Sequence, residues 1–322
     1  MDVGCEELGR SDPRVTVFGP HPLLTVTVEA LGSGADAPGV AEDIHFHAGG
    51  QGVWVARMAG MMGAEPVLCG FIGGETGTVL RPLLDAVAGR LRLVKTAGES
   101  GCYVVDRREG ERHVVAQALS PPPSRHELDD LFSETCTAAL GSKVLVVCNP
   151  LPDDALPVEV YANLVADVRA NGTPVLVDIS SPRLDHALAG GPDLVKVNEW
   201  ELAEFVRGPV SEPAQLRAAA ERVQEGGARS VVVTRGERPA LAVRGDEAYE
   251  LIPPSFERGS REGCGDSMMG AVAAAWANGV EWIDALVQGT AAGAADFLRH
   301  GLGTGSRSVV EELVAKVEVR RL

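Results

Sequence analysis

Short runs of continuously apolar residues alternate with longer Ala-rich helical patterns over the second half of the chain. The apolar runs are VLVVCN (144–149), PVLVD (174–178), DLVKVN (193–198) and SVVVT (230–234). Continuous rather than alternating hydrophobicity is typical of strands that are buried on both faces. Helical patterns such as 154–170 and 199–207 lie between them, so the sequence predicts βαβ units and a parallel sheet covered on both sides.

The first third of the chain has a different pattern. Apolar and polar residues alternate over 15–31 and over 101–118, and the second segment contains the charged turn Arg-Arg-Glu-Gly-Glu. Both segments predict antiparallel hairpins. Such hairpins on an α/β core predict a small lid beside a ligand cleft, which open α/β sheets form at the carboxyl ends of their strands. We expect the lid to be built within about 20–47 and 98–118.

Composition and charge exclude several classes of protein. The 322 residues are 45% hydrophobic, which suits one large folded domain over 14–322, and the acidic, polar residues 1–13 predict a flexible tail. A net charge of −16 without a basic run argues against nucleic acid or anionic membranes as partners. The six cysteines form no zinc or disulfide pattern, and no signal-peptide profile or membrane-spanning run is present. We therefore expect a cytoplasmic protein.

The segment GSREGCGDSMMGAVAAAWANG (259–279) has the strongest chemical pattern. Gly263 and Gly265 allow a sharp turn directly before Asp266 and a helix of small and apolar residues. Backbone N–H groups at such a helix N-terminus form an anion hole suited to a phosphoryl group, and Asp266 could accept the proton of an attacking hydroxyl. Alternatively, Asp266 only caps the helix. Because the helix is apolar nearly all round, it must be buried, which favours a site.

Three further patterns allow two interpretations each. Gly49, Gly50 and Gly52 precede an apolar helical pattern, and they indicate either close approach to a ligand or a tight turn into a core helix. Asn198 and Glu201 follow a buried strand, where ligand contacts and a helix cap are equally good explanations. The histidines at 21, 45 and 47 match no zinc spacing, so we expect them to be ordinary residues.

Taken in order, these segments resemble the ribokinase-like, phosphofructokinase-B family, and most closely its branch of 1-phosphofructokinases and tagatose-6-phosphate kinases. The resemblance runs from about Val15 to the C-terminus. Its two signatures are AGGQGVWVAR and GCGDSMMG, and between them lie NPLPDD (149–154), VKVNEWEL (195–202) and VVVTRG (231–236). Two signatures in register with three intermediate segments make a chance match improbable.

The resemblance implies a ribokinase-like three-layer α/β/α core with a mostly parallel sheet and a small antiparallel β lid. It implies ATP with Mg²⁺ as donor, Asp266 as base, and Gly263, Cys264 and Gly265 as the anion hole. It also implies that Asn198 and Glu201 organise Mg²⁺ indirectly and that Thr234 and Gly236 lie on the nucleotide side. Relatives in this branch pair through lid strands, so a homodimer is expected.

The departures from the family pattern cluster on the acceptor side. Thr25 stands where the branch has a sugar-binding Asp, Gln51 replaces the Lys of Gly-Gly-Lys-Gly, Trp54 replaces an Asn, and the lid segment reads Ser-Gly-Cys-Tyr, ending at Tyr103. The expected substrate contacts are Thr25, Gly49, Gly50, Gln51, Trp54 and Tyr103. Lost cations and added aromatic surface predict an unphosphorylated, sugar-like or partly aromatic alcohol as acceptor.

Two other functions stay open. One is a 1-phosphofructokinase-type hexose-phosphate kinase, in which Trp54 simply packs in the core. The other is a catalytically silent nucleotide-binding protein, against which the presence of Asp266 between the glycines and the helix argues.

Overall fold

The computed structural model describes residues 13–30, 42–110, 112–298 and 305–322. The tail predicted over residues 1–13 therefore lies outside the described residues, apart from Pro13. Within the described ranges, no helix is both long enough and apolar enough to cross a membrane.

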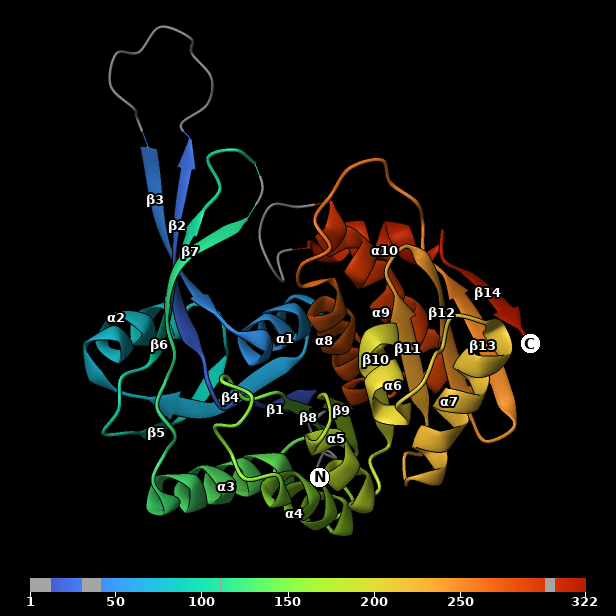
Figure 1. Cartoon of the computed structure of the whole chain (residues 1–322), viewed down its shortest axis with the longest axis horizontal. Helices are drawn as coiled ribbons and strands as arrows, with labels where there is room; N and C mark the ends of the chain where they lie inside the picture. The colour runs from blue at the N-terminus through green and yellow to red at the C-terminus, as the bar shows by residue number, and fades with distance from the viewer. Residues whose placement is uncertain (1–12, 31–41, 111, 299–304) are drawn as a thin grey trace, which may run out of the picture.

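A large sheet forms the centre of the fold (Figure 1). Its strands in the described residues follow the spatial order β14-β13-β12-β11-β10-β9-β8-β1-β4-β5. Their bounds are β1 Arg14–Phe18, β4 Glu65–Ile72, β5 Arg90–Lys95, β8 Val144–Cys148, β9 Val175–Asp178, β10 Leu194–Asn198, β11 Val231–Arg235, β12 Arg238–Arg244, β13 Glu247–Ile252 and β14 Glu318–Arg321. Pairing is parallel from β5 through β11 and antiparallel from β11 to β14.

Helices cover both faces of this sheet. Their bounds are α1 Gln51–Met61, α2 Gly74–Asp85, α3 Arg125–Leu140, α4 Glu159–Ala170, α5 Arg183–Ala189, α6 Glu199–Val206, α7 Pro213–Glu225, α8 Cys264–Ala277, α9 Trp282–Phe297 and α10 Arg307–Val314. Helices α3 to α7 share one buried cluster with Leu145 and Val147 of β8, whereas α1, α2, α8 and α9 share another with Val144 and Val146. Both faces of β8 are thus buried, as its continuous apolar sequence requires, and the predicted three-layer core is confirmed.

A second, smaller sheet has the order β3-β2-β6-β7 and stands away from the core (Figure 1). Its strands are β2 Leu23–Ala30, β3 Glu42–Gly49, β6 Gly101–Asp106 and β7 His113–Ala118. The hairpins β2–β3 and β6–β7 are antiparallel, and a parallel pairing of β2 with β6 joins them. We call this sheet the lid.

One predicted hairpin is wrong. Residues 15–31 do not form a hairpin, because β1 lies inside the large sheet, parallel to β4 and β8, and only β2 belongs to the lid. Both faces of β1 are buried, since Val15, Thr16, Val17 and Phe18 are not exposed to solvent. The alternation of apolar and polar residues in this segment therefore does not mark a strand with one face in solvent. The chain changes sheets at residues 19–22. The predicted hairpin within 101–118 is confirmed as β6–β7.

Candidate active site

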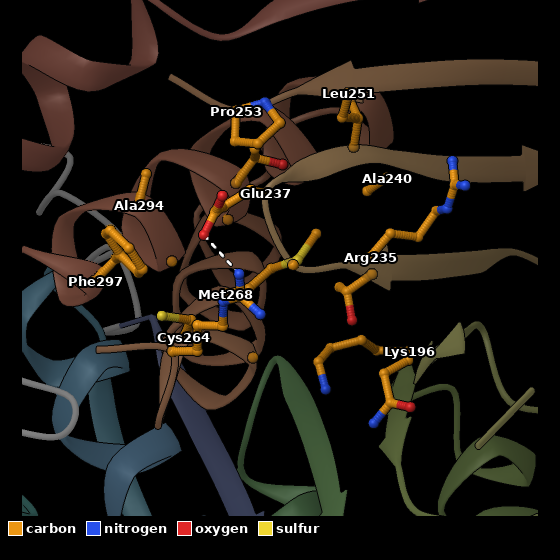
Figure 2. Close-up of a pocket in the computed structure, with 18 of the residues that line it drawn as sticks. Lys196, Arg235, Glu237, Ala240, Leu251, Pro253, Cys264, Met268, Ala294 and Phe297 are labelled. Atoms are coloured by element: carbon orange, nitrogen blue, oxygen red, sulfur yellow. Dashed lines mark hydrogen bonds and ion pairs between the residues drawn. The ribbon is translucent and has the colours of Figure 1, made fainter. Parts of the chain in front are cut away.

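A cavity of about 360 Å³ lies at the carboxyl ends of β9, β10 and β11, beside the N-terminus of α8. One end of it, the polar end, is lined by Gln51, Asp178, Lys196, Asn198, Glu201 and Asp266. At the other end, the apolar end, lie Leu251 and Pro253, and the lining also includes Ala240, Phe256, Ala294, Phe297 and the charged Arg235, Glu237, Arg238 and Arg261. In Figure 2, Lys196 lies low in the view, whereas Leu251 and Pro253 lie at the top. The position matches the ligand cleft expected of an open α/β sheet.

The turn before α8 directs backbone N–H groups at the polar end. Gly263 is the N-cap residue with φ 76°, a left-handed conformation that a residue with a side chain adopts only with strain. Its carbonyl accepts the Ser267 N–H at 2.8 Å, which closes the first turn. The N–H groups of that turn have no helical carbonyl to bond, and together with the helix dipole they attract an anion.

Close packing fixes α8 in place. A Cβ added to Gly270 would lie 2.5 Å from the carbonyl oxygen of Val55 in α1. A Cβ added to Gly289 of α9 would lie 2.5 Å from a methyl group of Val272 in α8. Both distances are far below van der Waals contact, so α8 packs against its neighbours at a separation that only glycine allows.

Asp266 lies in the first turn of α8 and lines the cavity. It does not cap the helix, since Gly263 occupies the N-cap position and no side chain bonds there. Removal from water and repulsion by Asp178 raise the pKa of Asp266 to about 8, against the opposing effects of Lys196 and a hydrogen bond from Gln51. A carboxyl group with a pKa near neutrality can both accept and release a proton at physiological pH.

A buried ion pair lies next to this carboxyl group. The sequence analysis did not predict it. Lys196 Nζ lies 2.7 Å from Asp178 Oδ1, and both side chains are buried. Burial alone would lower the pKa of Lys196, but the carboxylates of Asp178, Glu201 and Asp266 outweigh it and raise the pKa, so the ammonium stays charged. A Cβ on Gly265 would come within 3.1 Å of Lys196 Nζ, so this glycine leaves room for the ammonium beside the N-terminus of α8. The sequence did contain one indication of a special position, because Lys196 is a charged residue within an otherwise apolar strand pattern.

Asn198 and Glu201 form the helix cap that the sequence allowed, and they also line the cavity. Asn198 Oδ1 accepts the N–H groups of Trp200 and Glu201 at 2.9 Å, and Glu201 Oε2 accepts the Asn198 N–H at 2.8 Å. These bonds form a capping box at the start of α6. Both residues also line the polar end of the cavity, and burial raises the pKa of Glu201. The helix cap therefore orients the same side chains toward the cavity.

Thr234 and Gly236 lie on the same side of the cavity. Thr234 is the residue before the last in β11, and its hydroxyl donates to the Val197 carbonyl oxygen of β10 at 3.5 Å. Gly236 has φ 65° in the turn between β11 and β12. In the same turn, Glu237 accepts a hydrogen bond from Arg261 at 2.8 Å, the interaction drawn as a dashed line in Figure 2. This ion pair links the β11–β12 turn to the loop before α8.

Among the six predicted acceptor contacts, Gln51 lines the cavity. Thr25 and Tyr103 are direct neighbours across β2 and β6, and Gly49 packs against Thr25. Gly50 is the N-cap residue of α1 with φ 103°, and Trp54 lies one turn further along that helix, partly buried. The structure thus groups Thr25, Gly49 and Tyr103 in the lid, and their contact with an acceptor stays a prediction.

Comparison with known proteins decides the family. The model of the pfkB family carbohydrate kinases matches residues 24–308 of this chain. The protein belongs to this family. As a pfkB carbohydrate kinase it is a phosphotransferase, and the predicted ribokinase-like fold is confirmed by solved structures of its relatives.

Several of the similar proteins are named phosphofructokinases. The ATP-dependent 6-phosphofructokinase isozyme 2 of Escherichia coli (strain K12) is 30% identical over 84% of this chain and 88% of its own length. The 1-phosphofructokinase of Rhodobacter capsulatus is 29% identical over 80% of this chain and 81% of its own length. A solved structure, the tetrameric inhibited form of phosphofructokinase-2 from Escherichia coli, superposes with a TM-score of 0.82 at 26% identity, covering 94% of this chain and 98% of that one.

Proposed function

We propose that this pfkB kinase transfers the γ-phosphoryl group of ATP to a hydroxyl of a sugar-like acceptor that carries no phosphate, with Asp266 as the base. The observation that carries the proposal is the position of Asp266. Its carboxyl group has a pKa of about 8 and lies in the first turn of α8, beside the N–H groups of Gly263, Cys264 and Gly265. A general base and an anion hole thus share one helix terminus.

The two ends of the cavity suit a nucleoside triphosphate. The apolar end fits a base, the polar end offers Lys196 and the α8 terminus to phosphates, and the Escherichia coli relative is named ATP-dependent. The described residues contain no group of three or more His, Cys, Asp or Glu side chains that could hold a metal ion. That suits Mg²⁺, which usually keeps its waters and binds through one or two carboxylates and the substrate phosphates. Glu201, with Asn198, would hold it indirectly, and bound Mg²⁺ would neutralise phosphate charge.

Residues of the chain act on the proton and on the phosphoryl group during the proposed transfer. Asp266 accepts the proton of the acceptor hydroxyl as its oxygen forms a bond to the γ-phosphorus. The bond from that phosphorus to the bridging oxygen breaks, and ADP leaves with the electron pair. Lys196 and the N–H groups at the α8 terminus stabilise the negative charge of the phosphoryl group in flight, because they are fixed before the reaction begins.

The cations at the strand ends support an acceptor without a phosphate. Arg183 is buried between the Asn149 side chain, the Asp153 carbonyl and the Ser180 hydroxyl. The lid arginines Arg107 and Arg112 both contact Glu262. Each of these cations already has a protein partner, so a sugar phosphate would have to displace one of them.

The names of the relatives favour a second candidate, a fructose-phosphate kinase. The paired cations and the neutral Gln51 argue against it. A silent nucleotide-binding protein is a third candidate, and the raised pKa of Asp266 argues against that one, since binding alone needs no base.

The deciding experiment follows ADP release from Mg-ATP with free sugars, nucleosides, cyclitols, fructose 6-phosphate, fructose 1-phosphate and tagatose 6-phosphate. We expect release with an uncharged acceptor only. Asp266→Asn should lose turnover by at least about 10²-fold with nucleotide binding kept, the lower end of the effect of a positioned base. Asp284→Asn, an exposed acid on α9, is the matched control. Release with a sugar phosphate alone would replace our acceptor by that of the relatives, and nucleotide binding without any release would favour the silent protein.

We also propose that the protein pairs with a second copy through the lid. Ile44 and Phe46 of β3 are 55% and 53% exposed although both are large and apolar. In the register of the lid they lie opposite Val28 and Val26, and Val26 lies opposite Val104, so these side chains form one apolar face. An exposed face of this kind marks an interaction site. The related phosphofructokinase-2 in its inhibited form is tetrameric, so association of copies has a precedent in the family.

A further inference from the structure

We infer that Arg261 binds the phosphate chain of the nucleotide, and that it exchanges the carboxylate of Glu237 for these phosphates when the nucleotide enters the cavity. The inference rests on the proposed donor site, because it names a residue that would hold ATP there. The ion pair of Arg261 and Glu237 then has a role beyond linking two loops.

The ion pair lies on the path that a nucleotide must take through the cavity. Both residues line the cavity, and in Figure 2 their dashed hydrogen bond lies between Pro253 at the top of the view and Lys196 low in it. A nucleotide with its base at the apolar end and its terminal phosphate at the polar end therefore passes the ion pair with its ribose and inner phosphates. A phosphate at this place is attracted by the guanidinium and repelled by the carboxylate, so it competes with Glu237 for Arg261.

Little free energy is needed to displace Glu237. The side chains of Arg261 and Glu237 are 74% and 57% exposed, and the hydrogen bond between them is formed by one guanidinium nitrogen, Nη2. Ion pairs as exposed as this one change an equilibrium constant by about fivefold at most, because water and salt screen them. A guanidinium can donate two parallel hydrogen bonds to a phosphate, which is the stronger interaction. The lid arginines that contact Glu262 are far less exposed, so they are not released as easily.

Two other arginines at this side of the cavity are held by a different carboxylate. Arg235 and Arg238 both contact Glu199, the first residue of α6, whose side chain is largely buried. Among these side chains, three guanidinium groups thus share two carboxylates, which favours the entry of an anion. Arg261 is the member of the three whose carboxylate partner is the more exposed and the more easily replaced.

The backbone that carries Arg261 is held on both sides of this residue. The Ser260 N–H donates to the Phe297 carbonyl oxygen of α9 at 2.9 Å. On the other side, the lid arginines contact the Glu262 carboxylate. The guanidinium can therefore turn from one partner to the other on its own side chain, while the loop before α8 keeps its position.

Two neutral substitutions separate exchange from a purely structural link. Arg261→Gln removes the guanidinium, so we expect the Kd for ATP to rise by about tenfold or more, because hydrogen bonds between charged groups are among the strongest. Glu237→Gln removes the competing carboxylate and should lower this Kd by about two- to fivefold, the strength of an exposed ion pair. The two variants thus shift the affinity in opposite directions. A link that only joins the two loops would be lost in both, and both would bind ATP more weakly.

The controls lie a few residues away in the same loop. Arg258→Gln and Glu257→Gln remove the same two charges at exposed positions outside the cavity. Both should change the Kd for ATP by less than about twofold, since salt screens charges that are more than about 10 Å apart. They measure the effect of net charge alone.

Isothermal titration calorimetry of the full-length protein with Mg-ATP measures these affinities without an acceptor. Adenosine, which carries no phosphate, is the second probe, and we expect Arg261→Gln to bind it as the wild type does. Equal weakening for ATP and adenosine would show that Arg261 only supports the cavity, and it would overturn the inference. Weaker ATP binding by Glu237→Gln would overturn it as well, because the carboxylate would then not compete with the phosphates.

The wild type separates this inference from the proposed function. If the wild type binds ATP and both variants match it, the inference fails and the proposed donor site stands. If the wild type binds no ATP, the proposed kinase function fails, and the inference fails with it.

Discussion

Asp266 binds its proton more tightly in the folded protein than in the unfolded chain. The pKa is about 8 in the fold, because burial and Asp178 disfavour the carboxylate, against an ordinary value of 3.8. The folded state therefore loses stability relative to the unfolded state as pH rises from about 4 to 8. Asp266→Asn removes this titration. We expect the melting temperature of Asp266→Asn, relative to wild type, to increase between pH 5 and pH 9.

Differential scanning fluorimetry at both pH values measures this difference. The exposed Asp284→Asn should show no such change with pH. A difference between Asp266→Asn and wild type that is the same at pH 5 and pH 9 would mean that Asp266 is ionised throughout.

The ion pair of Lys196 and Asp178 gives a second prediction at this scale. Both side chains are buried, so removing one leaves the other charge without its partner. Lys196→Met should lower the free energy of unfolding by about 3 to 5 kcal/mol in urea titrations, and Lys196→Met/Asp178→Asn by clearly less. The exposed Lys143→Met should change it by less than about 0.5 kcal/mol. Equal losses in the single and double variants would show that the pairing itself is unimportant.

Single residues were predictable where a short motif carries them. Asp266 and its glycines, Gly263 and Gly265, lie within four residues of sequence, so their common turn could be inferred directly. The pairing of Lys196 with Asp178 could not, because it depends on the register in which Val177 of β9 lies beside Val195 of β10. Apolar strands that are buried on both faces give no pattern from which such a register can be derived.

At the scale of elements, the lid contacts the loop that precedes α8. Arg112 Nη1 lies 2.8 Å from Glu262, Arg107 Nη2 lies 3.6 Å from it, and Glu262 directly precedes Gly263. Both arginines belong to the connection between β6 and β7. Two ion pairs thus connect the lid to the turn that we propose as the anion hole.

Removing the ion pairs between Glu262 and the two lid arginines should slow catalysis, although none of these residues lines the cavity. We expect Glu262→Arg to lower kcat by roughly tenfold or more, since a displacement of about 1 Å at the reacting atoms can cost about 10²-fold. Arg112→Glu/Glu262→Arg restores opposite charges and should recover much of the loss. Steady-state kinetics on the two single variants and the double variant form the test. A double variant as slow as the slower single variant would contradict a role for the ion pair.

Elements were predictable where their hydrophobic pattern has one explanation. Strands β8, β9, β10 and β11 match the continuous apolar runs, which only a sheet covered on both faces can bury. The assignment of β1 to a hairpin was wrong because the strand has five residues. In so short a segment, the sequence pattern of a half-exposed strand cannot be distinguished from that of a fully buried strand. The antiparallel strands β12 to β14 were missed, although Gly245 marks the turn between β12 and β13.

At the scale of the whole molecule, the apolar face of the lid should determine the state of association. We expect the wild type to be a dimer in size-exclusion chromatography with light scattering, and Phe46→Lys to be a monomer, because a charge would be buried unpaired in the interface. Val79→Lys, also at an exposed apolar position but on α2, should leave the dimer intact. A dimeric Phe46→Lys would show that copies associate through another surface. Since each copy carries a net charge of −16, added salt should strengthen pairing.

The glycine contacts around α8 have a consequence for how such an enzyme can change over generations. Any side chain at Gly270 or Gly289 would push α1, α8 and α9 apart and carry Asp266 out of the cavity. We therefore expect few substitutions to be tolerated at the contacts between α1, α8 and α9. The lid face that carries Ile44 and Phe46 should tolerate more substitutions, because these side chains are exposed. New acceptors should arise in this lineage through altered lid strands, while α1, α8 and α9 are inherited nearly unchanged.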